Sequence, residues 1–178
     1  MTITVRRFAA HEWRMYRELR LHALSDAPDA FGSTYDWEAA RTDSDWEDRL
    51  RVSAAAETAM PVVAFFGGTP VGLAWGRQDA HEATLAHLFQ VWVSPPFRGQ
   101  GVGRFLTDAV IAWARDRGIR TLRLGVTASH PAARHLYERV GFVNAGEPKP
   151  LRSGSSVLSQ PMQLALAPAA QSDPPNER

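Results

Sequence analysis

The sequence predicts an α/β (α+β) fold, because segments with the apolar pattern of strands and segments with that of helices both occur along the chain. Short apolar runs bounded by Gly and Pro are typical of strands, and apolar residues that recur every three or four positions are typical of amphipathic helices. The length of 178 residues suits one domain with a tail. We therefore expect a single domain over residues 1–166.

The first third of the chain is expected to be mostly helical. Residues 3–8 predict a short opening strand, and the apolar spacing of residues 9–25 predicts a helix. This helix should end before Pro28, because proline disfavours the helical conformation of the residue that precedes it. A second helical region is expected over 36–55, with a break near 42–44.

Strands and helices alternate in the rest of the chain. Gly67 to Pro70 is a turn by composition, so the apolar segments on either side of it are expected to form a hairpin. Beyond residue 60 we expect strands at 61–66, 71–76, 83–93, 121–126, 142–143 and 162–166, the last two pairing, and helices at 101–117 and 131–140. Residues 167–178 are rich in Ala, Pro and Ser without an apolar period, which predicts a disordered C-terminal tail.

Composition excludes several classes of function. The 20 basic and 19 acidic residues give a net charge of +1, which favours no nucleic-acid partner. The chain has no cysteine, and this excludes disulfides, cysteine-ligated zinc, iron–sulfur clusters and a thiol nucleophile. No two histidines have metal-ligand spacing on one element, so no metal is expected. No segment has the apolar length of a membrane span or signal core, and we expect a cytoplasmic protein.

A loop with three glycines is the most informative segment. An apolar strand ending at Val91, Trp92 and Val93 leads into Gly99, Gly101 and Gly103, which precede an amphipathic helix. Glycines let backbone N–H groups converge on one point, and a helix N-terminus adds partial positive charge, so the loop suits a phosphate. Arg98 and Arg104 bring full charges beside it. A P-loop needs Gly-x4-Gly-Lys followed by Ser or Thr, and the chain has no such string. The dinucleotide pattern Gly-x-Gly-x-x-Gly also fails, since Arg104 and Leu106 stand where its third glycine would be needed.

Two motifs resemble the GNAT superfamily of acyl-CoA-dependent N-acyltransferases. The run from Arg98 to Gly103 is similar to its Arg/Gln-x-x-Gly-x-Gly/Ala loop. About 30 residues later, the run from His130 to Phe142 is similar to its second signature, Asn-x-x-Ala-x-x-Leu-Tyr-Glu-x-x-Gly-Phe, with His130 in place of the asparagine. The resemblance implies a mixed, mostly antiparallel central sheet of six to seven strands flanked by helices, in which one pair of central strands splays apart.

The resemblance also implies acetyl-CoA as the co-substrate and a primary amine as the acceptor. Its cofactor-binding residues map onto two segments of this chain, namely Val91, Trp92, Val93, Arg98, Gly99, Gln100, Gly101, Val102, Gly103 and Arg104, and then His130, Ala133, Arg134 and Tyr137. Backbone groups near Val91 and Val93 would hold the thioester, and the run from Gln100 to Arg104 would hold the pyrophosphate.

Tyr137 matches the family's general acid, and a phenol with a pKa near 10 can protonate a departing thiolate. For the general base we expect His87, whose pKa near 6.5 allows it to accept a proton at neutral pH. Glu82, Glu38 and Asp36 are alternatives, and a chain of water molecules to bulk solvent is another.

Several questions stay open in the sequence. We expect the helical region that carries Trp37 and Trp46 to form a lid with an aromatic wall over the acceptor, although simple packing explains these residues equally well. A small-molecule acceptor is favoured. The alternatives are a protein N-terminus or lysine as acceptor, a non-catalytic acyl-CoA-binding module, and an arginine-based nucleic-acid binder. Members of the family can dimerise, so a homodimer is also an open alternative.

Overall fold

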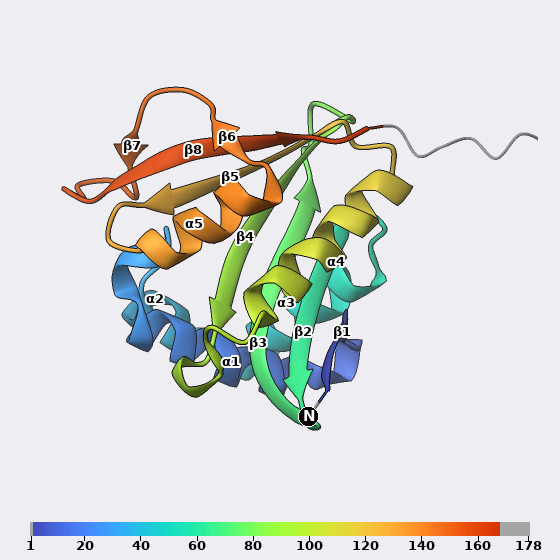
Figure 1. The fold of residues 1–178 in the computed structure, drawn as a ribbon. Helices are drawn as coiled ribbons and strands as arrows, with labels where there is room; N and C mark the ends of the chain where they lie inside the picture. The colour runs from blue at the N-terminus through green and yellow to red at the C-terminus, as the bar shows by residue number, and fades with distance from the viewer. Residues whose placement is uncertain (1, 168–178) are drawn as a thin grey trace, which may run out of the picture.

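The computed structural model describes residues 2–167 and shows one central sheet with helices on both faces (Figure 1). The strands follow the order β1-β2-β3-β4-β5-β8-β6, and β7 pairs with β8. Neighbouring strands are antiparallel except β4 and β5, which are parallel. This agrees with the mixed, mostly antiparallel sheet that the sequence predicts. Six strands have five residues or more, and two further pairs of residues form β6 and β7.

The strands and helices occur in the expected order along the chain. The strands are β1 (Ile3–Arg7), β2 (Ala59–Phe66), β3 (Thr69–Gln78), β4 (Leu85–Val93), β5 (Thr121–Thr127), β6 (Val143–Asn144), β7 (Lys149–Pro150) and β8 (Leu158–Ala165). The α-helices are α1 (Trp13–Asp26), α2 (Tyr35–Ala39), α3 (Asp43–Ala55), α4 (Val102–Asp116) and α5 (Pro131–Val140). Short 3-10 turns are η1 (Ala10–Glu12), η2 (Pro28–Ala30) and η3 (Pro95–Phe97).

Two apolar cores lie on the two faces of the sheet. On one face α4 and α5 pack against the strands, with Leu106 and Val110 among the fully buried side chains. On the other face α1 and α3 cover the sheet, and there Tyr16, Trp46 and Trp75 form an aromatic cluster. Burying both faces explains why the central strands carry few polar residues, since a two-sided sheet excludes water from both sides.

The helical region expected over 36–55 is two helices. Thr42 starts α3, because its Oγ1 accepts a hydrogen bond from the Asp45 backbone N–H (3.2 Å) while the Asp45 carboxylate accepts from the Thr42 N–H (2.9 Å). This reciprocal capping box ends the shorter helix α2 just before it. The break covers residues 40–42, at the start of the segment 42–44 where the sequence places it, and Glu38 on α2 is buried.

The C-terminal strand differs from the expectation. It begins at Leu158 rather than at residue 162, and its main partner is β5 rather than β6. The predicted pairing with the segment after Gly141 is present over two residue pairs, Val143 with Gln163 and Asn144 with Met162. The predicted disordered tail lies outside the described residues apart from Ala167. None of the helices within residues 2–167 combines the length and the apolar character that crossing a membrane would require.

Candidate active site

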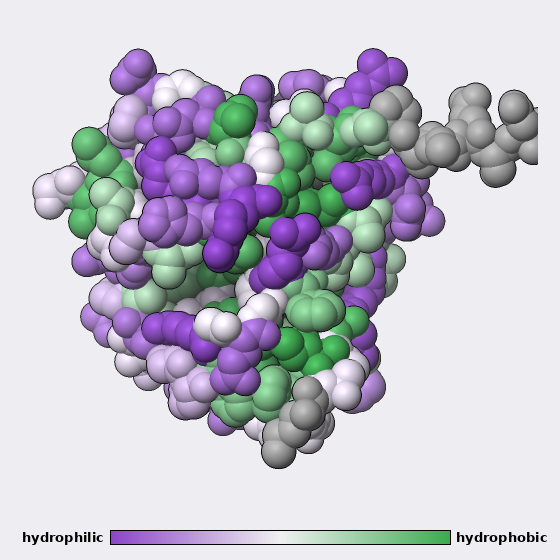
Figure 2. Space-filling model, in the orientation of Figure 1, coloured by the Kyte–Doolittle hydropathy of each residue, from purple (hydrophilic) through white to green (hydrophobic). Residues whose placement is uncertain are grey.

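A cavity of about 1090 Å³ lies where β4 and β5 diverge. The two strands pair only from Leu85 to His87, opposite Thr121 to Arg123, and the rest of β4 has no partner strand on that side. The lining comes from β4, β5, the glycine loop and α5, and also from α1, α2 and α3 across the sheet. Figure 2 shows the hollow on the face between α5 and α1, rimmed by hydrophilic side chains with apolar ones inside. The predicted splay therefore produces a passage between the two faces.

A bulge in β4 shapes the wall of this cavity. Gln90 has φ 56°, the one positive φ outside glycine within residues 2–167, and the register of β3 with β4 shifts at this point. The bulge places both Phe89 and Gln90 toward α1, and the Tyr16 hydroxyl donates to Gln90 Oε1 (3.0 Å). A residue in a strained conformation with a buried partner is a frequent mark of a functional site. Val91 and Val93 follow the bulge on the part of β4 that does not pair with β5.

The glycine loop lies at the N-terminus of α4, as the sequence predicts. Gly101 has φ 88°, a conformation that costs other residues energy, and it precedes the helix directly. The first helical hydrogen bond runs from the Phe105 N–H to the Gly101 carbonyl (3.1 Å). The N–H groups of Val102, Gly103 and Arg104 come before it and have no partner within the helix. They form the anion-binding end of α4.

Two arginines flank the loop and line the cavity, and both have carboxylate partners. Arg98 pairs with Asp26 at the end of α1, and its Nε donates to the Val93 carbonyl (2.9 Å). The Trp92 indole N–H donates to the same Asp26 carboxylate (2.8 Å). Burial raises the pKa of Asp26, but these two donors and the positive charge of Arg98 outweigh it and lower the pKa. Arg104 pairs with Asp108 one turn further along α4 (2.8 Å).

His130 lines the cavity at the start of α5. Its Nε2 is buried and has no hydrogen-bond partner among the described residues. A buried ring nitrogen without a partner destabilises a protein unless a ligand or water completes it. His130 is therefore a lining residue with one ring nitrogen left without a partner among the described residues.

Tyr137 lines the same wall from α5. The side chain is 6% exposed and its ring contacts Phe142 edge-on, with 5.7 Å between centroids. Burial raises the pKa of Tyr137 well above that of a free phenol, so the hydroxyl keeps its proton at physiological pH. Ala133 lies one turn earlier on α5 and lines the cavity as well.

Three of the predicted site residues do not line the cavity. His87 lies at the start of β4, where the strand still pairs with β5, and its side chain is 43% exposed with Nε2 at 3.0 Å from Asp79 Oδ2. The N–H groups of residues 81 and 82 and the His87 ring hold the pKa of Asp79 down, at about 2. Gln100 donates to the Pro96 carbonyl (3.1 Å), and Arg134 pairs with Glu138 (2.9 Å).

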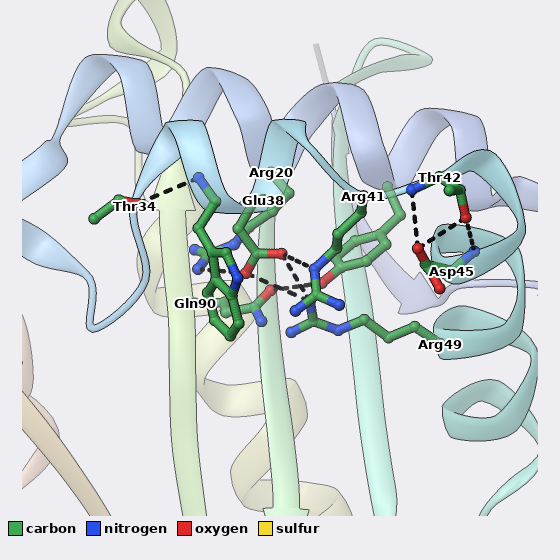
Figure 3. Close-up of polar contacts among 10 residues, drawn as sticks. Arg20, Thr34, Glu38, Arg41, Thr42, Asp45, Arg49 and Gln90 are labelled. Atoms are coloured by element: carbon green, nitrogen blue, oxygen red, sulfur yellow. Dashed lines mark hydrogen bonds and ion pairs between the residues drawn. The ribbon is translucent and has the colours of Figure 1, made fainter.

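The far end of the cavity is built by an ionic cluster (Figure 3). Glu38 is 2% exposed, and three arginines approach its carboxylate. Arg41 Nε lies 2.7 Å from Oε2, Arg49 Nη1 lies 3.0 Å from the same atom, and Arg20 Nη2 lies 3.6 Å from Oε1. Burial raises the pKa of Glu38, but the arginines outweigh it, so the pKa is lowered and the group is ionised.

The two tryptophans expected in the lid have different places. Trp37 on α2 lines the cavity and is 66% exposed. Trp46 on α3 is fully buried and packs edge-on against Tyr16, with 5.5 Å between centroids. Trp46 therefore belongs to the core beneath the helices rather than to an acceptor wall. Amphipathic spacing alone could not separate the two, because both lie near the same polar segment.

The sequence reasoning missed Arg20, Arg41, Arg49 and Gln90 as site residues. Two of them carry a local signal. Arg20 lies four residues after Tyr16 on the apolar stripe of α1, where a charged side chain is unusual. Gln90 is the one amide in the otherwise apolar centre of β4. Arg41 and Arg49 have no such signal, because their approach to Glu38 depends on how α2 and α3 pack.

The fold and the site together define the class of an acyl-CoA-dependent acetyltransferase: a mostly antiparallel sheet with one diverging parallel pair, and a glycine loop at the head of the helix that joins the two strands. The chain belongs to the acetyltransferase (GNAT) family, whose model matches residues 12–142. This confirms the resemblance that the two sequence motifs predict.

Particular relatives agree with this assignment. A mycothiol acetyltransferase from Rhodococcus erythropolis is 39% identical over 77 residues, which are 42% of this chain and 26% of the relative. Thus the chain spans about a quarter of that relative's length. An acetyltransferase of the GNAT family from Streptococcus pneumoniae has the same fold, with a TM-score of 0.79 at 22% identity, covering 93% of this chain and 100% of that one. The structure of yncA from Salmonella typhimurium, with its cofactor acetyl-CoA, has a TM-score of 0.77 at 20% identity, covering 97% and 99%.

Proposed function

We propose that the chain is an N-acetyltransferase that transfers the acetyl group of acetyl-CoA to a primary amine by direct attack. The observation that carries the proposal is the cavity between β4 and β5, which connects the anion-binding loop on one face with the helices α1 to α3 on the other. Such a passage lets two substrates meet from opposite sides of the sheet, as a reaction without an acyl-enzyme intermediate requires.

The lining fits acetyl-CoA at three points. The unpaired N–H groups at the head of α4, with Arg98 and Arg104 beside them, suit the pyrophosphate. The open edge of β4 at Val91 and Val93 offers backbone hydrogen bonds to the amides of a pantetheine arm. The buried Nε2 of His130 is without a partner and suits a polar group of the same arm.

The transfer needs an oxyanion donor and a proton for the leaving group. When bound, acetyl-CoA supplies the thioester whose carbonyl carbon the amine attacks. Backbone N–H groups along the open edge of β4 stabilise the carbonyl oxygen, a contribution of about 3 kcal/mol for one well-placed donor. Tyr137 then donates its phenolic proton to the departing sulfur. The burial that raises the pKa of Tyr137 keeps the phenol protonated until the thiolate forms, and it disfavours a bare thiolate in the same cavity as well as the phenolate that the transfer leaves.

Water removes the proton from the acceptor amine in this proposal. Of the two carboxylates in the lining, Glu38 is held ionised by three arginines and Asp26 is engaged with Trp92 and Arg98. Their lowered pKa values make both weak bases. His87 is outside the lining. Solvent that enters at the open rim in Figure 2 is therefore the remaining route.

The proposal includes one catalytic domain up to residue 166, a cytoplasmic location and a small-molecule acceptor. It gives no role to nucleic acid, to a membrane or to a metal ion. A non-catalytic acyl-CoA-binding module would not need the phenol of Tyr137 at the cavity wall, and this observation favours the enzyme.

The test is release of CoA from acetyl-CoA by the purified chain across a panel of amines, namely amino acids, amino-acid amides, polyamines, aminoglycosides and peptides with a free N-terminus. We expect at least one class to give turnover above the rate of hydrolysis. Tight binding of acetyl-CoA by calorimetry without turnover on any amine would favour the binding module instead.

A further inference from the structure

The far end of the cavity carries more positive charge than its one buried carboxylate balances, and the transfer step does not use it. Three guanidinium groups surround one carboxylate: Arg20 from α1, Arg41 between α2 and α3, and Arg49 from α3 face Glu38 (Figure 3). The other carboxylate of the lining, Asp26, pairs with Arg98 beside the glycine loop. Asp45 lies nearby on α3, but its carboxylate is hydrogen-bonded to Thr42. Within this cluster the three guanidinium charges therefore exceed the one carboxylate charge of Glu38 by two.

The hydrogen-bond donors of these arginines are also in surplus. A guanidinium has five N–H donors, and one carboxylate cannot satisfy three such groups. Arg41 uses Nε and Arg49 uses Nη1 on Glu38, while Arg20 Nη2 lies at 3.6 Å, beyond hydrogen-bond distance. The Arg20 side chain is 4% exposed, and its Nε and Nη1 have no partner among the described residues. Buried N–H donors of a charged group rarely lack a hydrogen-bond acceptor unless a ligand supplies one.

Aromatic rings hold two of the guanidinium groups in place without using their N–H donors. Phe31 faces Arg20, with 4.8 Å from the guanidinium carbon to the ring centroid, and Trp37 faces Arg41 at 5.1 Å. A ring face stabilises the charge but leaves the in-plane donors available. Phe31 and Trp37 both line the cavity and give it apolar walls around the charged end.

This charged end is connected to the reaction strand. Arg49 lies over the ring of Tyr16, with 5.9 Å to the centroid, and the Tyr16 hydroxyl donates to Gln90 Oε1 at 3.0 Å. Gln90 directly precedes Val91 on the open edge of β4. The contacts from Arg49 through Tyr16 to Gln90 therefore connect the arginines with the open edge of β4. A small acceptor suits this arrangement, because its anionic group could contact the arginines while its amine is near that edge.

We propose that Arg20, Arg41 and Arg49 bind a carboxylate of the acetyl acceptor, so that the acceptor is a free amino acid or a similar small amine with a carboxylate near its nitrogen. The inference rests on the proposed function and names its substrate class. Arginine forks bind carboxylates through paired hydrogen bonds, and Glu38 keeps the three forks turned toward one point. The same charge surplus repels polyamines.

The first experiment compares each L-amino acid with its C-terminal amide as acceptor for the full chain at saturating acetyl-CoA. The two compounds of a pair differ at the carboxyl end, where the amino acid has a negative charge and the amide has none. The amine of the amide is less basic, so a larger fraction of it is deprotonated and reactive. The comparison is therefore biased against the proposal. We expect kcat/KM to be at least tenfold higher for the amino acid than for its amide in the preferred pair. Equal or better use of amides, or a preference for polyamines, would overturn it.

Variants assign the effect to the arginines. Arg41→Gln and Arg49→Gln change side chains that are only partly buried, so we expect them to fold. Each should raise KM for the amino acid about tenfold and change kcat/KM for the amide by less than twofold. Arg51→Gln is the matched control, because Arg51 is on α3, pairs with Asp48 and does not line the cavity. An equal loss for amino acid and amide would show that the arginines are structural and would refute the proposal.

A binding measurement separates this inference from the proposed function. Calorimetry with the amino acid and its amide, in the presence of CoA without an acetyl group, needs no catalysis. Binding of the amino acid but not of the amide, weakened in Arg41→Gln, would support the carboxylate subsite even if no acetyl transfer occurred. Turnover with other amines and no binding of any amino acid would sink the subsite and leave the acetyltransferase intact.

Discussion

Tyr137 is buried, and in the proposed mechanism it donates the proton to the leaving group. Its pKa is raised by burial, so the phenol stays protonated over the whole physiological range and is ready to act as an acid. We expect Tyr137→Phe to lower kcat about tenfold or more, the range of general acid catalysis, while the dissociation constant of acetyl-CoA changes little. Tyr35→Phe is the control, since Tyr35 is exposed and outside the lining. An unchanged kcat would remove Tyr137 from the mechanism.

The raised pKa of Tyr137 also predicts the shape of the pH profile. A group that must be protonated and whose pKa lies above its usual value of about 10 loses its proton only in strongly alkaline solution. Between pH 7 and 10 we expect kcat at saturating substrates to stay level or rise. A basic limb of kcat with a midpoint below pH 9, absent from Tyr137→Phe, would contradict this.

A variant of His87 distinguishes two routes for removing the proton of the acceptor amine, namely His87 as the base and water. Because its side chain lies outside the cavity beside Asp79, we expect His87→Gln to keep kcat and kcat/KM within about twofold of the wild type, less than the contribution of a general base. The measurement is the pH dependence of kcat/KM from pH 6 to 9. A tenfold loss, together with disappearance of an acidic limb that the wild type shows, would restore His87 as the base.

At the scale of elements, the head of α4 depends on the left-handed conformation of Gly101. Gly101→Ala should destabilise the fold by about 1 kcal/mol through strain at φ 88°, and it should raise the dissociation constant of acetyl-CoA severalfold by moving the loop's N–H groups. Gly118→Ala is the matched control at the other end of the same helix, where φ is 72°. It should cost similar stability and leave the dissociation constant unchanged. A similar change in binding for both variants would argue against a phosphate site at the head of α4.

Glu38 joins α1, α2 and α3 through its arginine partners, so it should matter for stability as well as for the acceptor. Glu38→Gln leaves three arginines without their buried counter-charge, and we expect a loss of about 3 kcal/mol in the free energy of unfolding at pH 7. Because the folded-state pKa of Glu38 is lowered, its contribution is complete above the unfolded value of about 4.3 and is lost as the pH falls through the folded value.

The difference between wild type and Glu38→Gln should therefore shrink on acidification below about pH 4. Urea unfolding at pH 7 and at successively lower pH measures it. Glu47→Gln on the exposed side of α3 is the control and should change stability by less than about 0.5 kcal/mol. A loss for Glu38→Gln that is independent of pH would show that packing, not charge, is what Glu38 contributes.

In the whole molecule, the cavity between β4 and β5 is a gap in the sheet that a ligand can fill, in contact with elements on both faces. Acetyl-CoA at 100 times its dissociation constant should raise the free energy of unfolding by about 2.7 kcal/mol, which corresponds to about 5–10 °C in Tm for a chain of this size. Thermal unfolding with and without millimolar acetyl-CoA measures this. Adenosine, which has neither pyrophosphate nor thioester arm, should leave Tm unchanged, and no shift with acetyl-CoA would remove the basis of the proposed function.

Most of the fold and the segments proposed to bind acetyl-CoA follow from local sequence. The hairpin at Gly67, the capping of α3 by Thr42 and the glycine loop before α4 each depend on residues close together in the chain, and so their patterns are visible without a structure. The two signatures lie in segments that α4 and β5 bring to one end of the sheet. Tyr137 and His130 are therefore placed in the cavity as the motifs predict.

The arginine cluster proposed to bind the acceptor depends on tertiary packing. Composition already sets 19 arginines against a single lysine, but it does not say which of them meet. Arg20, Arg41 and Arg49 converge on Glu38 because α1, α2 and α3 pack against one another, and a change in that packing would weaken these ion pairs, since Coulomb attraction falls with distance. His87 has a side chain that suits a general base, yet it lies where β4 pairs with β5, outside the cavity. Trp46 has a side chain that suits an aromatic wall, yet core packing buries it. Sequence determines local conformation through neighbours along the chain, whereas the direction of a long side chain is set by contacts from elements far apart in it.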